Sequence, residues 1–165
     1  MKSSQLYNYI YKRLNDITPI KADCGKLCDK ACCKGDSDTG MYLFPYEEIM
    51  FSNTNHNFRY NIKKVKGKNL FICDGACDRN YRPLSCRIFP LMPYIDSSGK
   101  FSVSIDCRAK GICPIAYADE LSNFDPEFIK RVKKVSYLLI RFDVIKKFIY
   151  ELSEECNEYK NYFTL

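Results

Sequence analysis

The residues of this chain best suited to chemistry are its cysteines, of which there are 10 among 165 residues. Nine of them fall into three groups: Cys24, Cys28, Cys32 and Cys33; Cys73, Cys77 and Cys86; and Cys107 with Cys113. Crowded thiolates repel one another, and a bound cation removes that cost. Zinc is held tetrahedrally by four thiolates, and iron–sulfur clusters are also held by cysteine thiolates. The sequence therefore predicts that these nine cysteines bind metal, and it leaves zinc and an iron–sulfur cluster open.

The spacing of the first group, CGKLCDKACC, allows two geometries. On a helix, Cys24, Cys28 and Cys32 would share one face and could present three thiolates to one centre. Cys33 would then point about 100° away, because an α-helix has about 3.6 residues per turn, and would reach a different metal or none. If the stretch is a loop, turns at residues such as Gly25 could fold the cysteines around one ion. Both geometries stay open at this point.

Several familiar cysteine motifs are absent from the sequence. No two cysteines have the C-x₂-C spacing of zinc knuckles and thioredoxin-like sites. The first group reads C-x₃-C-x₃-C-C, which argues against the cluster loop of radical enzymes that use S-adenosylmethionine. Nine thiols exceed one four-cysteine site, so the sequence allows two centres or one centre with spare thiols. The missing knuckles favour an iron–sulfur centre slightly.

Two further residues could join such a site but are better explained otherwise. His56 is the only histidine and lies in a polar stretch, which favours a surface side chain over a metal ligand. Cys156 follows Ile149 and Leu152 along an apolar helical stripe, which favours a buried apolar thiol.

The sequence also indicates in which compartment the protein lies and which kinds of partner it has. The stretch MKSSQLYNYIYKRLND lacks the apolar core of a signal peptide, and no segment approaches the roughly 18 apolar residues of a membrane-spanning helix. We therefore expect a cytoplasmic protein without membrane contact, in which dense cysteines are more often ligands than disulfides. The net charge of +6 permits an anionic partner but is too small to require nucleic acid, which we do not expect. A protein partner stays open.

The hydrophobic periodicity and the turn residues predict the helices and strands that must position the cysteines. We expect a helix over 4–18, an extended segment over 41–44 and a short helix after Pro45. Two hairpins are predicted, one with strands 58–66 and 68–72 around Gly67 and one turning at 96–99. One long helix or two consecutive helices follow between 126 and 160, with Asp125 as N-cap. The expected fold is therefore α+β: a single domain over 1–165, with an irregular cysteine-rich core at 24–113 and a helical tail at 125–160.

The segment RPLSCRIFPLMPY is stiffened around its cysteine. Pro83 restricts both its own backbone and that of Arg82, as Pro90 and Pro93 do further on. Arg82 and Arg87 flank Cys86, where positive charge would offset that of a metal–thiolate centre and donate hydrogen bonds to sulfur. The alternative is that both arginines pair with nearby acids such as Asp74, Asp78 or Asp106.

The combination of CDKACCKG with RPLSCRIFPLMPY resembles the YkgJ-like cysteine-cluster proteins. That family is described as having a zinc- or iron-chelating domain, which also occurs in flagellin lysine N-methylases. The resemblance covers residues 24 to about 113. It implies a metal site that includes the following residues: Cys24, Cys28, Cys32, Cys33, Cys73, Cys77 and Cys86, with Cys107 and Cys113 as trailing cysteines.

Three functions follow as hypotheses. The leading one is a cysteine-cluster protein that binds zinc or an iron–sulfur cluster, without an assigned cellular role. The second is a metal-dependent enzyme that modifies proteins, such as a lysine N-methylase-like or redox protein. It lacks support from a glycine-rich nucleotide loop or from paired acid–base residues. The third is a zinc-stabilised binding module that presents the basic hairpin around 63–68 to an anionic partner.

Overall fold

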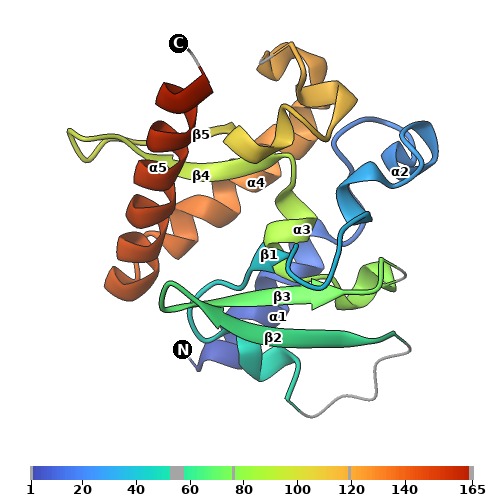
Figure 1. Ribbon diagram of the computed structural model, residues 1–165. Coiled ribbons are helices and arrows are strands. Elements are labelled where there is room, and N and C mark those ends of the chain that lie inside the picture. The colour runs from blue at the N-terminus through green and yellow to red at the C-terminus, as the bar shows by residue number, and fades with distance from the viewer. Residues whose placement is uncertain (1, 53–57, 76, 119, 164–165) are drawn as a thin grey trace.

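The computed structural model describes residues 2–52, 58–75, 77–118 and 120–163. The helices are α1 (Ser3–Leu14), α2 (Cys24–Leu27), α3 (Leu84–Ile88), α4 (Pro126–Leu139) and α5 (Asp143–Phe163). The strands are β1 (Met41–Tyr42), β2 (Tyr60–Val65), β3 (Lys68–Cys73), β4 (Leu91–Ile95) and β5 (Phe101–Ile105). The predicted α+β class, with an N-terminal helix, short hairpins and a C-terminal helical segment, is confirmed (Figure 1).

The first predicted hairpin is confirmed as β2 and β3. The strands pair antiparallel, with Val65 opposite Lys68 at one end and Tyr60 opposite Cys73 at the other. Lys66 and Gly67 form the two-residue turn, and both have positive φ, 50° and 77°. Such mirror-image turns match the right-handed twist of the paired strands. The short strand β1 adds to the other edge of β3, so that the sheet order is β1-β3-β2 and Cys73 lies at the end of its central strand.

The second predicted hairpin is confirmed as β4 and β5. Its turn is held by the Asp96 side chain, which accepts hydrogen bonds from the backbone N–H groups of Ser98 and Lys100, both at 2.9 Å. The sheet lies between α4 and α5 (Figure 1). On the α5 side, the backbone N–H of Ile95 donates to the Ser153 hydroxyl at 3.0 Å.

The main core joins the long helices to the β4–β5 sheet. Its fully buried side chains include Tyr7 and Ile10 of α1, Phe128 and Val132 of α4, and Ile149 of α5. The predicted stripe of α4 and α5 is therefore buried, whereas in α1 Tyr7 is buried in place of Tyr9, which was predicted to face the core and is exposed. No helix among the described residues is both long and apolar enough to cross a membrane.

The C-terminal segment forms two helices, the second of the two alternatives that the sequence allowed. Asp125 caps the first as predicted, because its side chain accepts a hydrogen bond from the backbone N–H of Glu127 at 2.9 Å. The helix α4 ends at Leu139, and α5 begins at Asp143. The short helix predicted after Pro45 is reduced to a single 3₁₀ turn, Glu47–Met50, because Tyr46 before it has φ of 67° and interrupts the helical path.

Candidate metal centre

The loop that carries the first four cysteines is only briefly helical. The Asp23 side chain caps α2 by accepting from the backbone N–H of Gly25 at 3.1 Å. The helix ends after one turn because Asp29 and Lys30 both have positive φ, 48° and 53°. A 3₁₀ turn, Ala31–Cys33, follows. The continuous helical stripe through Cys24, Cys28 and Cys32 is therefore wrong, and the loop geometry is the one that the chain adopts.

Four free cysteines gather around one small cavity, and we call them the first quartet: Cys24, Cys28, Cys32 and Cys113. The cavity has a volume of about 240 Å³, and its other walls are apolar, with Leu27, Phe89 and Pro114 among them. The Cys28 thiol donates to the carbonyl oxygen of Cys24 at 3.3 Å. Burial, and then the nearby thiols of Cys28 and Cys113, raise the pKa of Cys24. Figure 1 shows α2 beside the segment that follows β5, which carries Cys113.

The remaining free cysteines form a second quartet: Cys33, Cys73, Cys77 and Cys86. Cys73 hydrogen-bonds to Cys77, and Cys86 of α3 lies close enough to Cys77 and Cys33 to interact with their charges. Gly75, which has a φ of 80°, brings the loop after β3 against the 24–33 loop at Cys33. A Cβ atom at Gly75 would lie 2.8 Å from the carbonyl oxygen of Cys33, so the two backbones approach closely there.

Two thiols of the second quartet have a lowered pKa, which favours the thiolate, the form that binds metal. The hydrogen bond from Cys73, with help from the positive charge of Arg82, lowers the pKa of Cys77 to about 6. The hydrogen bond from Cys32, again with Arg82, lowers the pKa of Cys33 to about 7. Arg82 is thus a positive charge that acts on both of these thiols. Burial acts in the opposite direction on both thiols.

Arg82 points its guanidinium group at the second quartet. It hydrogen-bonds to Cys77 and interacts with the charges of Cys33 and Cys86. Its Nε atom is buried and has no hydrogen-bond partner among the described residues. A buried N–H without an acceptor is costly, so the site is set up for a further negative group beside the thiolates. This position agrees with the role expected for Arg82 next to a metal–thiolate centre.

Arg87 has a different role from the ones that the sequence suggested. Its guanidinium donates to the carbonyl oxygens of Arg82 at 2.7 Å and Asn80 at 2.6 Å. Its Cζ atom lies 4.0 Å from the centre of the Tyr11 ring. Arg87 therefore bonds to backbone carbonyl groups rather than to a thiolate, and its charge interacts with that of Glu47. Arg87 holds the loop before α3 against α1. It therefore affects the cysteine site only by fixing the position of this backbone.

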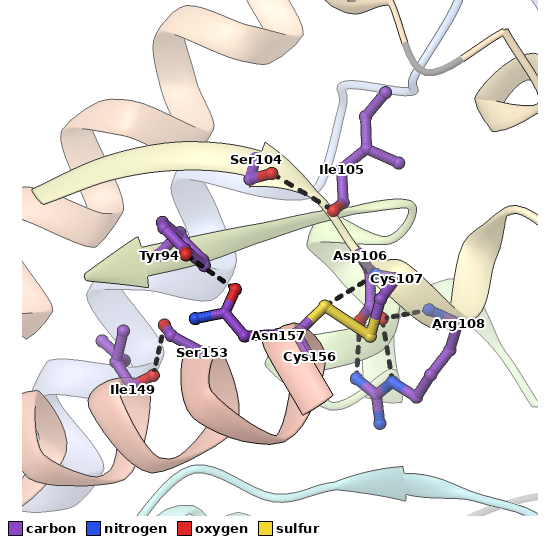
Figure 2. Close-up of a disulfide and its surroundings, with 10 residues drawn as sticks. All are labelled: Tyr94, Ser104, Ile105, Asp106, Cys107, Arg108, Ile149, Ser153, Cys156 and Asn157. Atoms are coloured by element: carbon purple, nitrogen blue, oxygen red, sulfur yellow. Dashed lines mark hydrogen bonds and ion pairs between the residues drawn. A yellow bond between two sulfur atoms is a disulfide. The ribbon is translucent and has the colours of Figure 1, made fainter. Parts of the chain in front are cut away.

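Cys107 lies apart from both quartets and is bonded to Cys156 (Figure 2). The two Cα atoms are 5.5 Å apart, and the disulfide ties the turn after β5 to α5 across 49 residues of sequence. The backbone N–H of Cys107 also donates to the Cys156 sulfur at 3.1 Å. Cys156 is buried as expected, but it is not the free thiol that the sequence suggested. In this disulfide form, Cys107 offers no thiolate to the predicted metal site.

Asp106, Cys107 and Cys156 place their ligand atoms within 4.8 Å of one another, and among the described residues they are the one buried group that meets this spacing. The group could hold a metal ion. The Asp106 carboxylate is already paired, however, because Arg108 donates hydrogen bonds to both of its oxygens, at 2.8 and 2.5 Å (Figure 2). Metal binding here would require reduction of the disulfide and displacement of Arg108. Of its three members, only Cys107 was expected from the sequence to bind metal, and Cys156 was expected to be a buried apolar thiol.

The basic hairpin offers less free charge than its sequence suggests. Lys63 forms an ion pair with Asp38 at 2.9 Å, and Lys68 forms one with Glu155 at 2.9 Å. Both lysines therefore serve contacts within the chain, which weakens the hypothesis of an anionic partner at this hairpin. His56, predicted to lie on the surface, falls outside the described residues.

Comparison with family models, curated proteins and solved structures gives no match for this chain. No relative therefore assigns a substrate, a metal or a partner to it.

Proposed function

We propose that this chain is a metalloprotein that binds an iron–sulfur cluster through its free cysteines, with zinc as the alternative. Four thiolates drawn from separate segments are the ligand set of either centre. A bound centre would cross-link the loop at 24–33 to β3 and α3 and, if it is a cluster, would supply one-electron redox chemistry. The resemblance to YkgJ-like proteins agrees with this proposal and stays a prediction.

The unpartnered Nε atom of Arg82 carries the proposal. This nitrogen is buried beside Cys33, Cys77 and Cys86, in a position where the protein itself provides no acceptor for it among the described residues. Metal–thiolate centres with four cysteines have a net negative charge, and hydrogen bonds to their sulfur atoms adjust their properties. The donor and the charge of Arg82 fit that need.

The spacing of the sulfur atoms favours a cluster over a single zinc ion. Tetrahedral Zn–S bonds of about 2.3 Å hold sulfur atoms about 3.8 Å apart. Among the described residues, no three free cysteines bring their sulfur atoms within 4.8 Å of one another. A four-iron cluster takes its thiolates on different irons and so accepts a wider spacing. Zinc would require both quartets to contract.

Anaerobic purification followed by analysis of iron, zinc and acid-labile sulfide, with a visible absorption spectrum, tests the proposal. We expect a brown protein with iron and sulfide in equal amounts. A colourless protein with bound zinc would support the zinc alternative. The variant Cys86→Ser should hold less metal than the wild type, whereas Cys156→Ser, which changes a cysteine outside both quartets, should hold as much. Metal-free protein after gentle anaerobic purification would overturn the proposal.

A further inference from the structure

We infer that the eight free cysteines form two separate metal centres, divided at the peptide bond between Cys32 and Cys33, and that the first quartet is the accessible one. This inference rests on the proposed function and extends it, since metal binding alone would be satisfied by one centre with spare thiols. It also gives the adjacent cysteines a distinct role each.

Apart from Cys33 itself, whose sulfur lies 4.0 Å away, the cysteines near Cys32 all belong to the first quartet. Cys32 interacts with the charges of Cys28 and Cys24, and all three line the cavity of about 240 Å³ that Cys113 completes. Cys113 enters from a distant segment, beside the 3₁₀ turn Pro114–Ala116. Four thiols from two segments around one cavity make a complete ligand set without any member of the second quartet.

Apart from Cys32, the cysteines near Cys33 all belong to the second quartet. Cys33 interacts with Cys77 and Cys86, and its carbonyl oxygen is held against Gly75. Although the sulfur atoms of Cys32 and Cys33 lie only 4.0 Å apart, the 3₁₀ turn at Ala31–Cys33, which has about three residues per turn, presents the two thiols to different neighbours. Neither Cys33 nor another member of the second quartet lines the cavity of the first quartet. The backbone thus directs the two adjacent thiols to different ligand sets.

The two sites also differ in their surroundings. Cys32 is exposed, whereas the other seven free cysteines are all half-buried, and the first quartet lines a cavity with apolar walls. All four cysteines of the second quartet are half-buried, and Arg82 supplies a partly buried positive charge beside them. A chelator therefore reaches the first quartet more easily, and a metal there should be the more labile of the two.

A matched pair of variants at neighbouring positions tests the division. Cys32→Ser and Cys33→Ser are purified anaerobically beside the wild type, and metal and sulfide per chain are measured for each. We expect the wild type to hold two centres, each single variant to hold one, and the double variant to hold none. Cys113→Ser and Cys86→Ser, far from the junction in sequence, should reproduce the two single losses if a variant at the junction fails to fold.

Release of metal to a chelator provides the second readout. The wild type should release metal in two phases that differ by about tenfold or more in rate. The fast phase should be missing from Cys32→Ser and the slow phase from Cys33→Ser. One centre in the wild type, with both variants losing it alike or both keeping it, would overturn the division while leaving the proposed function intact. A wild type without metal would instead overturn the proposed function.

Discussion

The sulfur atoms of Cys32 and Cys33 lie 4.0 Å apart, yet the two side chains belong to different groups of four cysteines. Cys32 faces Cys24, Cys28 and Cys113, whereas Cys33 faces the cysteines of β3 and α3. The short distance places the two ligand sets next to each other. It also explains why both thiols share a hydrogen bond, which lowers the pKa of Cys33 and raises that of Cys32.

Replacement of Arg82 should weaken the second centre selectively. In Arg82→Gln the positive charge beside Cys77 and Cys33 is lost, and we expect metal to leave the second quartet about tenfold faster than in the wild type. Arg82→Lys restores the charge but not the guanidinium geometry and should recover part of the difference. Chelator-induced release, followed by absorption, measures the effect. Arg141→Gln, an exposed change between α4 and α5, is the control; equal release from both glutamine variants would count against the role of Arg82.

Gly75 should matter more than other glycines with the same backbone angle. Gly75→Ala puts a Cβ atom 2.8 Å from the carbonyl oxygen of Cys33, so that this segment must move away from the second quartet. Gly99 has φ of 81° against 80° for Gly75, but nothing lies within 4 Å of its Cβ position. Both alanine variants should lose about 1 kcal/mol of stability from the left-handed backbone, and only Gly75→Ala should also lose metal. Unchanged metal content in Gly75→Ala would show that the close approach is unimportant.

The disulfide should stabilise the fold without affecting metal binding. Cys156→Ser removes a cross-link that spans 49 residues, and we expect the free energy of unfolding to fall by about 2–4 kcal/mol. Urea denaturation with and without reductant measures this, since reductant should destabilise the wild type but not the variant. Loss of metal from Cys156→Ser would mean that Cys107 and Cys156 belong to the metal site after all.

Glu47 should give the stability a specific pH dependence. Its carboxylate is buried and accepts hydrogen bonds from the Phe44 N–H at 2.9 Å, the Tyr11 hydroxyl at 2.6 Å and the Leu84 N–H. Burial outweighs these bonds and raises its pKa from 4.5 to about 7. The folded state therefore binds the proton more tightly than the unfolded state does. The resulting stabilisation is complete below about pH 4.5 and is lost as the pH rises through about 7.

Between about pH 5 and pH 8, the free energy of unfolding of the wild type should fall by about 2–3 kcal/mol more than that of Glu47→Gln. The variant is less stable throughout, because an amide cannot accept all of these hydrogen bonds, so the slope is the readout. Glu158→Gln, an exposed change in α5, should keep the slope of the wild type. Parallel slopes for Glu47→Gln and the wild type would contradict the assignment.

Local features of the fold were predictable because neighbouring residues determine them. Gly67 and the 96–99 segment mark hairpin turns, and Asp125 marks the start of α4, since each depends on a few adjacent backbone angles and hydrogen bonds. The end of α2 was harder to foresee. Asp29 and Lys30 adopt positive φ without a glycine, and nothing in the local sequence required it.

The division of the cysteines depends on contacts that only the tertiary fold creates. Cys107 and Cys113 are close in sequence, but α5 packs against the first, and the α2 loop packs against the second. The signal that the sequence did carry was the adjacent pair Cys32 and Cys33, because adjacent side chains on a helix or turn leave the backbone in different directions. The sequence therefore allowed two metal centres, but it did not indicate which cysteines belong to each centre.

Native mass spectrometry of the anaerobically purified wild type tests metal binding most directly, because it weighs the folded chain together with whatever its cysteines hold. We predict a mass above that of the polypeptide by the mass of iron–sulfur clusters, falling to the polypeptide mass on acid denaturation. A folded chain with the bare polypeptide mass, less only the two hydrogens lost on joining Cys107 to Cys156, would contradict it.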